Sequence, residues 1–239
     1  MLFSQKTIKR AFSVCLSTAG FKPPRPRKKI AFLASPAHRL VYIYVPKAAC
    51  TSLKSFICDI EPSIDLNLSR YAAPETLNGQ FIPYVRRLSA AELRRQYAGW
   101  NIFSFVRNPF WRLVSCYQDK IAGQFYEELS RTGFHKDMTF HEFIDHVCEV
   151  PDWLCDEHLA AQTYLLSDAR GRLLTNFLGH VESLSEDFPR LLEAANLSYE
   201  LRHYRKQKQE KLNIPDDRIA MIVNRYHRDF ELFGYPKQP

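Results

Sequence analysis

The fold expected for this chain depends on one stretch of its sequence, Tyr42-Ile-Tyr-Val-Pro-Lys-Ala-Ala-Cys-Thr-Ser-Leu-Lys54. Residues 41–45 are apolar, β-branched or aromatic, which is typical of a buried strand. Pro46 ends that strand, because proline cannot donate to a ladder of strand hydrogen bonds. Small residues follow, and they lead to two hydroxyl side chains at Thr51 and Ser52.

A helix is expected directly after this loop, since apolar side chains recur at helical spacing at Leu53, Phe56, Ile57 and Ile60. A loop between a strand and a helix N-terminus directs backbone N–H groups and the helix dipole at one point, which suits a phosphate or a sulfate. Lys47 adds a mobile cation. The loop has no glycine and so differs from the Walker pattern, in which the lysine follows the glycines. Taken alone, it is equally typical of an ordinary strand–turn–helix with a surface lysine.

A second strand–turn–helix unit begins at Asn101-Ile-Phe-Ser-Phe-Val-Arg107, an apolar strand that ends in an arginine. Pro109 suits the first position of the helix that follows. Ser115 lies eight residues after Arg107, two turns into that helix. A guanidinium at a strand end and a helix hydroxyl can together bind a second phosphate. In a purely structural unit, Arg107 would instead cap carbonyl groups and Ser115 would be an ordinary helix residue.

Together the two units resemble the sulfotransferases, and most closely the carbohydrate sulfotransferase branch that includes the chondroitin and dermatan enzymes and bacterial relatives. Val45-Pro-Lys-Ala-Ala-Cys-Thr-Ser52 is similar to their 5′-phosphosulfate loop, and Phe105-Val-Arg-Asn-Pro-Phe-Trp-Arg-Leu-Val-Ser-Cys-Tyr117 to their 3′-phosphate motif. Three further stretches match the same branch: Cys155-Asp-Glu-His-Leu-Ala-Ala-Gln162, Phe177-Leu-Gly-His-Val-Glu182 and Tyr226-His-Arg-Asp-Phe-Glu-Leu-Phe-Gly-Tyr235. The order of the five matches, which extend from about residue 41 to residue 235, makes the resemblance specific.

The resemblance implies a P-loop-like α/β fold of three layers, with a central, mainly parallel sheet flanked by helices. Strands that alternate with helices along the chain also predict an α/β domain. The implied reaction moves a sulfuryl group from 3′-phosphoadenosine 5′-phosphosulfate (PAPS) to a hydroxyl of a carbohydrate or glycoconjugate. Adenosine 3′,5′-bisphosphate (PAP) is then the product.

The resemblance also assigns site residues. Lys47 is expected to stabilise charge on the leaving phosphate. The loop residues expected to hold the 5′-phosphate with it are Ala48, Ala49, Cys50, Thr51 and Ser52, and those for the 3′-phosphate are Arg107 and Ser115. An alcohol that attacks sulfur must lose its proton, so a base is required. His158 matches the family's base, and Glu157 is the alternative.

The length of the chain limits the number of domains, and its charge limits the kind of binding partner. The 239 residues are enough for one sizeable domain, expected over 30–239 after a basic, proline-rich segment at 1–29. The net charge of +7 suits an anionic partner such as a nucleotide, an acidic glycan, nucleic acid or an anionic membrane, without choosing among them. We expect a carbohydrate or glycoconjugate partner and no nucleic acid. The oligomeric state cannot be read from the sequence.

The chain is expected to be cytoplasmic and bacterial. Its six cysteines form no secreted disulfide framework, which indicates a reducing compartment. No window reaches the roughly 18 apolar residues that span a bilayer, which leaves only peripheral membrane contact. The Golgi members of the resembled family carry an N-terminal anchor, whereas the start of this sequence indicates a frayed basic helix.

Other elements follow from local patterns. Capping boxes at 89–92 and 139–142 predict helix starts. A strand is expected within 173–181, and helices are expected over 184–195 and 215–233. The long irregular segment at 61–87 is expected to shape the acceptor cleft, as in the resembled family. In the basic run at 202–211, Arg205 or Lys208 is a candidate contact for the 3′-phosphate.

Two other functions stay open at this point. A P-loop-type nucleotide-dependent kinase would need a hydroxyl that binds Mg²⁺ after the lysine and an acidic partner at a strand end, and no such pair is found. A non-enzymatic basic module that binds acidic polymers is also compatible with the charge. A metal site is not expected: His141 and His146 are five residues apart rather than four, and the cysteines lack paired spacing.

Overall fold

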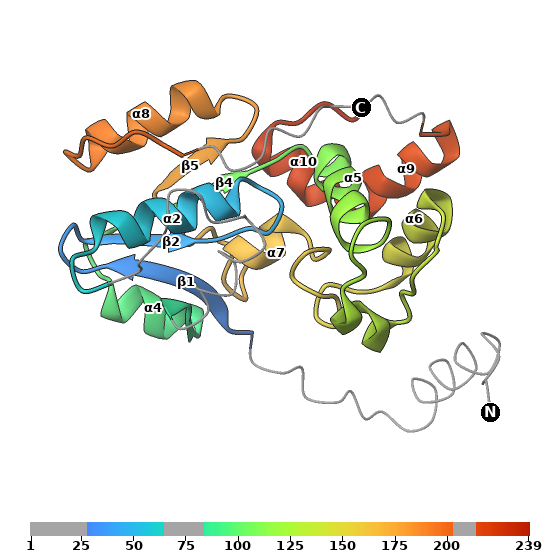
Figure 1. The fold of residues 1–239 in the computed structure, drawn as a ribbon, viewed down its shortest axis with the longest axis horizontal. Coiled ribbons are helices and arrows are strands. Elements are labelled where there is room, and N and C mark those ends of the chain that lie inside the picture. Colours follow the sequence, from blue (N-terminus) through green and yellow to red (C-terminus); the bar gives the residue numbers. More distant parts are fainter. Residues whose placement is uncertain (1–27, 65–83, 203–213) are drawn as a thin grey trace.

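A computed structural model describes residues 28–64, 84–202 and 214–239 of the chain, and Figure 1 shows how its elements are arranged. The strands are β1 (Ile30–Ser35), β2 (Leu40–Ile43), β3 (Arg86–Leu88), β4 (Asn101–Val106) and β5 (Phe177–His180). The helices are α2 (Cys50–Ile60), α4 (Ala90–Gln96), α5 (Pro109–Lys120), η2 (Glu127–Thr132), α6 (Phe140–Glu149), α7 (Gln162–Leu166), α8 (Leu184–Ala194), α9 (Asp216–Arg225) and α10 (His227–Phe233).

The five strands form one sheet in the order β3-β1-β2-β4-β5. β2 pairs in parallel with β4, and β4 pairs in parallel with β5. β1 is antiparallel to both of its neighbours, so the sheet is mixed and β1 alone runs against the other four strands. The predicted α/β fold, a central sheet flanked by helices, is confirmed. Four of the five strands run in one direction, and two of the four neighbouring pairs are parallel. The parallel strands β2 and β4 are the two that lead into the predicted phosphate-binding loops.

Apolar side chains cover both faces of the sheet because they alternate along each strand. On β2, Leu40 and Tyr42 belong to a cluster shared with α2 and α8, whereas Val41 and Ile43 belong to a cluster shared with α4 and α7. Figure 1 shows α2 and α8 on one side of the sheet and α4 on the other. These are the three predicted layers. A strand buried on both faces is a continuous apolar run, which explains why the sequence identifies β2 and β4.

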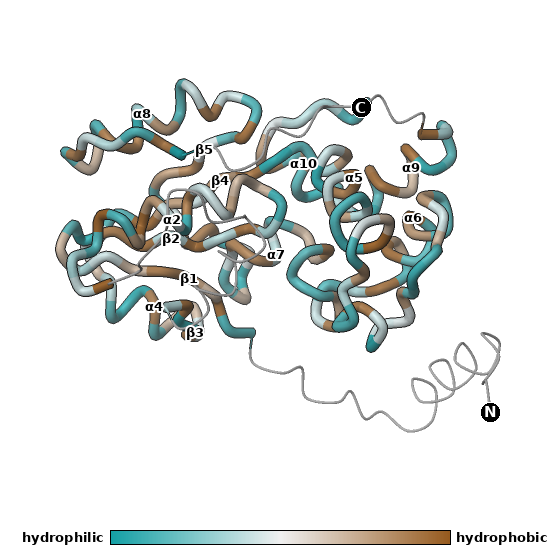
Figure 2. Tube along the Cα trace, in the orientation of Figure 1, coloured by the Kyte–Doolittle hydropathy of each residue, from teal (hydrophilic) through white to brown (hydrophobic). Residues whose placement is uncertain are grey.

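A third apolar cluster lies beside the sheet, in a helical lobe built from α5, α6, α9 and α10 (Figure 1). Its buried members include Phe110 of α5, Phe143 of α6, Ile222 of α9 and Phe230 of α10. Figure 2 shows hydrophobic and hydrophilic residues alternating along α6 and α8, as expected for helices with one buried face. Because α5 starts where β4 ends, it connects this lobe to the sheet.

Several predicted elements are confirmed with small shifts of their ends. β2 ends at Ile43 rather than at residue 45. α2 begins at Cys50, whereas the helical pattern in the sequence starts at Ser52. Both capping boxes, at 89–92 and 139–142, are formed. Pro109 occupies the first turn of α5 as predicted.

Two strands form without having been predicted, and one predicted strand is shorter than expected. β1 and β3 form where the sequence analysis predicts no strand. β3 is a short edge strand whose Arg86 and Arg87 are exposed, so it lacks the apolar pattern of a buried strand. The strand expected within 173–181 is confined to Phe177–His180, and Leu173 makes only an isolated bridge with Ser167.

The helix expected over 215–233 is broken into α9 and α10 at Tyr226. Tyr226 is 1% exposed and leaves helical geometry. After the break, the fully buried carboxylate of Asp229 accepts the backbone N–H groups of Gln162 and Thr163, each at 2.8 Å. The continuous helical spacing of apolar residues does not reveal this break. The contact of Asp229 with the start of α7 joins segments that are far apart in the sequence.

Some predictions lie outside the described residues: most of the expected acceptor loop, at 65–83, and the basic run with Arg205 and Lys208. The boundary predicted between 1–29 and 30–239 stays a prediction. Within 28–64, 84–202 and 214–239, no helix is long and apolar enough to cross a membrane. The five cysteines of these ranges are free thiols.

Gly179 of β5 lies directly against the Phe105 ring of β4. It pairs with Phe105 in the parallel register, and the fully buried Phe105 ring occupies the space that a Cβ atom at position 179 would need. A glycine is therefore required here by packing, not by backbone conformation.

We expect Gly179→Ala to lower the free energy of unfolding by about 1–3 kcal/mol, because the added methyl group displaces the Phe105 ring in a packed core. Urea unfolding followed by circular dichroism measures this change. The control is Ser185→Ala, at an exposed position of α8, which should change the same free energy by less than about 0.5 kcal/mol. Equal stability of Gly179→Ala and the unmodified protein would contradict the close packing of β5 on β4.

Candidate functional site

The loop between β2 and α2 has an unusual backbone. Lys47 and Ala49 both adopt left-handed conformations, with φ of 68° and 55°, which is uncommon for residues other than glycine. Ala48 lies between them, is fully buried, and donates its N–H to the Val45 carbonyl at 3.2 Å. Each such residue costs on the order of 1–3 kcal/mol. Contacts from the rest of the protein must therefore hold the loop in this shape.

The N-terminus of α2 faces this loop. Ala49 is the N-cap residue and has no side chain that accepts a hydrogen bond from the first turn. The N–H groups of Cys50, Thr51 and Ser52 are therefore not capped by the N-cap side chain, and the positive end of the helix dipole lies at the same place. The predicted loop residues thus surround a helix start with the geometry of an anion site. Their contact with a ligand stays a prediction.

The Lys47 side chain is held by an acidic residue that the sequence analysis does not identify. Lys47 Nζ lies 3.0 Å from Asp119 Oδ2, near the end of α5, and the Lys47 side chain is 13% exposed. Lys120 Nζ lies 3.4 Å from the same carboxylate oxygen. Two ammonium groups therefore share Asp119. If Lys47 moved toward a phosphate, Asp119 would keep Lys120 as its cationic partner.

Arg107 adjoins the lysine loop. Arg107 Nη1 donates to the Lys47 carbonyl at 3.3 Å. Gln162 fixes the Arg107 backbone, because Arg107 N–H donates to Gln162 Oε1 at 2.9 Å and Gln162 Nε2 donates to the Arg107 carbonyl at 2.7 Å. Burial lowers the pKa of Arg107 from its ordinary value. The guanidinium is thus partly removed from water, at the carboxyl end of β4 and next to the carboxyl end of β2.

The turn after Arg107 is also held by Glu182, which itself contacts Tyr235 near the C-terminus. Asn108 N–H donates to Glu182 Oε1 at 2.8 Å, and the Tyr235 hydroxyl donates to Glu182 Oε2 at 3.0 Å. Ser115 lies two turns into α5 and is 2% exposed. The sequence analysis notes the stretch that contains Glu182 but assigns it no role, because its partners are backbone and side-chain groups from distant segments.

Arg112 of α5 connects the donor loop to the segment that carries the predicted base. It is 2% exposed. Its Nε donates to the Pro46 carbonyl at 3.0 Å, its Nη1 to the Ala160 carbonyl at 2.7 Å, and its Nη2 to the Glu157 carbonyl at 2.9 Å. The role of Arg112 is not predicted from the sequence. The available signal is its spacing, since Arg112 lies four residues before the buried Cys116 and so faces the core.

His158 lies in the loop between α6 and α7 and is oriented by Asp156. His158 Nδ1 lies 2.6 Å from Asp156 Oδ1, which also accepts the His158 backbone N–H at 2.9 Å. Burial alone would raise the pKa of Asp156, but the hydrogen bonds and the charge of His158 outweigh burial and lower it. The Tyr126 ring packs edge-on against His158, with 5.6 Å between the ring centroids.

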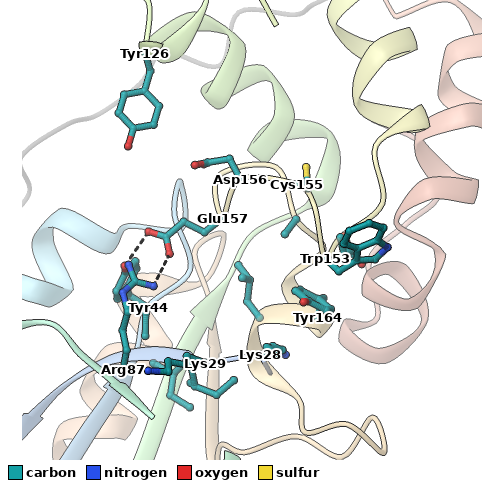
Figure 3. A pocket seen from close by; sticks show the side chains of 16 residues that line it. Lys28, Lys29, Tyr44, Arg87, Tyr126, Trp153, Cys155, Asp156, Glu157 and Tyr164 are labelled. Carbon is teal, nitrogen blue, oxygen red and sulfur yellow. Dashed lines mark hydrogen bonds and ion pairs between the residues drawn. The ribbon is translucent and has the colours of Figure 1, made fainter. Parts of the chain in front are cut away.

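Glu157, the alternative base, is held by a different pair of residues. Tyr44 donates its hydroxyl to Glu157 Oε1 at 2.8 Å, and Arg87 Nη1 lies 3.6 Å from Glu157 Oε2. Figure 3 shows Tyr44 and Arg87 converging on this carboxylate. Burial, followed by the charge of Glu157, raises the pKa of Tyr44 well above its ordinary value, so the phenol stays protonated and keeps donating.

A chain of contacts leads from the lysine corner to His158. Lys120, the second partner of Asp119, places its Nζ 4.8 Å from the centroid of the Tyr126 ring, and Tyr126 contacts His158. Inside the protein, Arg112 also links the lysine loop to the His158 segment, through its hydrogen bonds to the Pro46 and Glu157 carbonyls. Lys47, Arg107 and His158 therefore belong to one region of the molecule.

A cavity of about 510 Å³ opens beside this region (Figure 3). Tyr44, Tyr126, Asp156 and Glu157 line the end next to His158, and Lys28, Lys29, Arg87, Trp153 and Tyr164 are among the residues that line the rest. Its volume lies in the range of about 300–1,000 Å³ that is common for ligand sites. His158 is not among the lining residues, but Asp156 and Tyr126, which both contact it, are.

No metal centre is formed by the side chains that the structure describes: no group of three or more His, Cys, Asp or Glu residues is arranged to hold an ion. The two histidines weighed for a helical metal motif are separated. His146 Nε2 lies 2.7 Å from the Thr132 carbonyl, whereas His141 is exposed on α6.

Comparison with known proteins agrees with this geometry. The family model described as "Sulfotransferase family" matches residues 31–236. Carbohydrate sulfotransferase 14 of Mus musculus is 26% identical over 233 residues, which cover 85% of this chain and 60% of the relative. Carbohydrate sulfotransferase 14 of Danio rerio is 24% identical (85% and 62%), and carbohydrate sulfotransferase 10 of Pongo abelii is 24% identical (84% and 65%). The search of solved structures gives no match.

The relatives correct one prediction. They are carbohydrate sulfotransferases of vertebrates, namely mouse, zebrafish and orangutan, so the prediction of a cytoplasmic, bacterial protein is wrong. That prediction relied on cysteine spacing and on the first residues of the sequence. Neither feature identifies the group of organisms in which the related proteins occur. The chain spans about three fifths of the length of the first relatives it matches.

Three findings now agree: a family model that covers most of the chain, an α/β sheet with a lysine loop after β2, and an arginine after the neighbouring β4. The chain belongs to the sulfotransferase family.

Proposed function

We propose that this protein transfers a sulfuryl group from PAPS to a hydroxyl group of a carbohydrate or glycoconjugate. The observation that carries the proposal is the 3.3 Å hydrogen bond from Arg107 to the Lys47 carbonyl. It brings together, in the region of His158, the two corners that we expect to bind phosphate groups. Membership in the sulfotransferase family supports the donor, and similarity to carbohydrate sulfotransferases supports the acceptor class.

The two corners suit the two phosphate-bearing ends of PAPS. Residues Ala48 to Ser52 at the start of α2 would bind the 5′-phosphate through backbone N–H groups, and the small side chains let the ligand approach closely. Arg107 and Ser115 would bind the 3′-phosphate. Because ATP has no 3′-phosphate, this second corner would select PAPS over ATP.

Lys47 would neutralise the charge that develops on the leaving phosphate. Sulfuryl transfer, like phosphoryl transfer, depends on positioning and on electrostatic stabilisation more than on covalent steps. To act, Lys47 must leave Asp119. The movement does not leave a partly buried carboxylate unpaired, because Lys120 stays within 3.4 Å of the same oxygen.

His158 would accept the proton of the acceptor hydroxyl. Its Nδ1 faces the Asp156 carboxylate, which can only accept, so Nδ1 carries the hydrogen and Nε2 is left as the basic nitrogen. The lowered pKa of Asp156 keeps this carboxylate ionised at neutral pH. Glu157 is already engaged by Tyr44 and Arg87, so we favour His158 as the base.

Lys47→Ala should lower turnover by about 100- to 1,000-fold, the loss typical of removing one group that stabilises transition-state charge. Formation of PAP from PAPS with a panel of soluble glycan acceptors measures this loss. Lys120→Ala is the matched control, because it removes the other ammonium group on Asp119, and its turnover should fall far less. Equal losses in the two variants would argue against a special role for Lys47.

His158→Ala should lower turnover by about 100-fold or more while PAP binds as before, because a general base acts only in the chemical step. Single-turnover rates and PAP titrations separate the two effects. Asp156→Asn should reduce turnover less than His158→Ala, since it disturbs only the orientation of the imidazole. Turnover that survives in His158→Ala but disappears in Glu157→Gln would move the base role to Glu157.

The donor itself is tested by thermal shift. At 100 times its dissociation constant, PAP should stabilise the folded protein by about 2.7 kcal/mol, and ATP should stabilise it much less. Arg107→Ala should reduce the PAP effect, whereas Arg95→Ala, which removes an exposed arginine of α4, should preserve it. Stabilisation by ATP with Mg²⁺ but not by PAP would favour a kinase. Salt-sensitive polymer binding with no nucleotide effect would favour a basic binding module.

A further inference from the structure

A second cavity, of about 590 Å³, lies next to the one beside His158. The two cavities share four lining residues, Lys28, Asp152, Trp153 and Tyr164. The two cavities therefore adjoin along this shared wall, and together they are called the hollow below. The second cavity continues over α7 and α10 to Gly171 and Arg228, and the transfer reaction proposed above gives it no role.

The shared wall presents aromatic side chains. Trp153 is 41% exposed, although large hydrophobic side chains in the described residues are seldom this accessible. Figure 3 places Trp153 and Tyr164 at the end of the first cavity away from Tyr126. Flat apolar rings of this kind pack well against the C–H faces of sugar rings, which have polar groups at their edges.

Lys28 fixes the position of Tyr164. Its Nζ lies 4.3 Å from the centroid of the Tyr164 ring and donates to the Ser167 carbonyl at 2.8 Å. Burial lowers the pKa of Lys28 to about 8, so most of the side chain is withdrawn from water. The wall is therefore an ordered feature of the surface with a preformed shape.

The acidic side chains of the second cavity are already paired. Asp152 binds Arg225 at 2.7 Å, and Asp168 Oδ2 lies 3.0 Å both from Arg94 and from Arg172. Their charges are thus largely neutralised within the protein.

Two cationic side chains that line the hollow are not paired with an acidic group of the described residues. Lys29 in the first cavity and Arg228 in the second form no ion pair or hydrogen bond with the side chains that the structure describes. Arg228 is exposed on α10 and lies over Gly171, where a Cβ atom would overlap the guanidinium. One available cation on each side of an aromatic wall fits a chain that carries anionic groups at intervals.

Each cavity alone has a volume common for one small ligand, so a ligand that fills both is longer than a single sugar unit. We propose that the second cavity is a remote acceptor subsite, which binds sugar residues next to the one that is sulfated in an acidic, polymeric glycan. This inference rests on the proposed function, because it places the reacting hydroxyl in the first cavity. Arg228 then binds an anionic group of a neighbouring residue, and Trp153 packs against the chain between the two cavities.

The test compares acceptor lengths. Unsulfated chondroitin di- and octasaccharides serve as acidic probes, and dextran oligosaccharides of the same lengths serve as neutral ones. In the unmodified protein, kcat/KM should be about tenfold higher for the acidic octasaccharide than for the disaccharide, which corresponds to about 1.4 kcal/mol. The neutral series should show no such increase.

Arg228→Ala should remove most of this length preference, with the loss confined to the octasaccharide. Trp153→Ala should weaken both acceptors, because Trp153 lines both cavities. The matched control is Arg95→Ala, which removes an exposed arginine on α4 outside both cavities and should keep the tenfold preference. An unchanged preference in Arg228→Ala, or no preference in the unmodified protein, would overturn the proposal.

Two readouts on the same samples separate this inference from the proposed function. Stabilisation by PAP reports on the donor site, and calorimetric titration with the two acidic probes reports on the subsite without any turnover. Tighter binding of the octasaccharide that depends on Arg228, in a protein that PAP does not stabilise, would retain the subsite and reject the donor. Stabilisation by PAP with equal binding of both lengths would retain the donor and reject the subsite.

Discussion

One buried guanidinium holds the candidate site together. Arg112 donates hydrogen bonds to the carbonyl groups of Pro46, Glu157 and Ala160, so the loop after β2 and the segment before α7 are fixed to the same side chain of α5. A charge at this depth is tolerated only when its donors are satisfied. The carbonyl groups satisfy them, and in return they lose their freedom to move. The separation of the lysine loop from His158 is thus set by the size of a single planar group.

The parallel neighbours β2 and β4 supply the second constraint. Their carboxyl ends lie side by side, so the residues that follow them, Lys47 and Arg107, meet regardless of the sixty residues between them. Gln162 then locks the Arg107 backbone, and Asp229 caps the helix that begins with Gln162. The helical lobe therefore acts on the sheet through polar contacts at its boundary, in addition to apolar packing. This arrangement explains why the break between α9 and α10 matters for the site.

The sequence predicts those parts of the molecule that depend on local patterns. β2 and β4 are continuous apolar runs because both of their faces are buried, and the capping boxes are complete within four residues. Lys47 and Arg107 are found because they follow such strands. Arg112 and Asp119 are not found, since their partners are carbonyl groups or cations from distant segments and leave no spacing in the sequence. The direction of β1 and the hollow around Trp153 are equally inaccessible, because both depend on how complete elements pack.

The two left-handed residues between β2 and α2 should make this loop one of the first parts of the protein to open locally. A loop with an unfavourable backbone needs less free energy to leave its native shape than the sheet needs to unfold. Cys50 follows this loop directly and is partly exposed, whereas Cys58 and Cys116 are buried in the body of the protein. The thiol at position 50 should therefore react with an alkylating reagent through a small, local fluctuation. The two buried thiols should become reactive only when the whole domain unfolds. The alkylation rates of the three cysteines would therefore distinguish local opening of the loop from global unfolding.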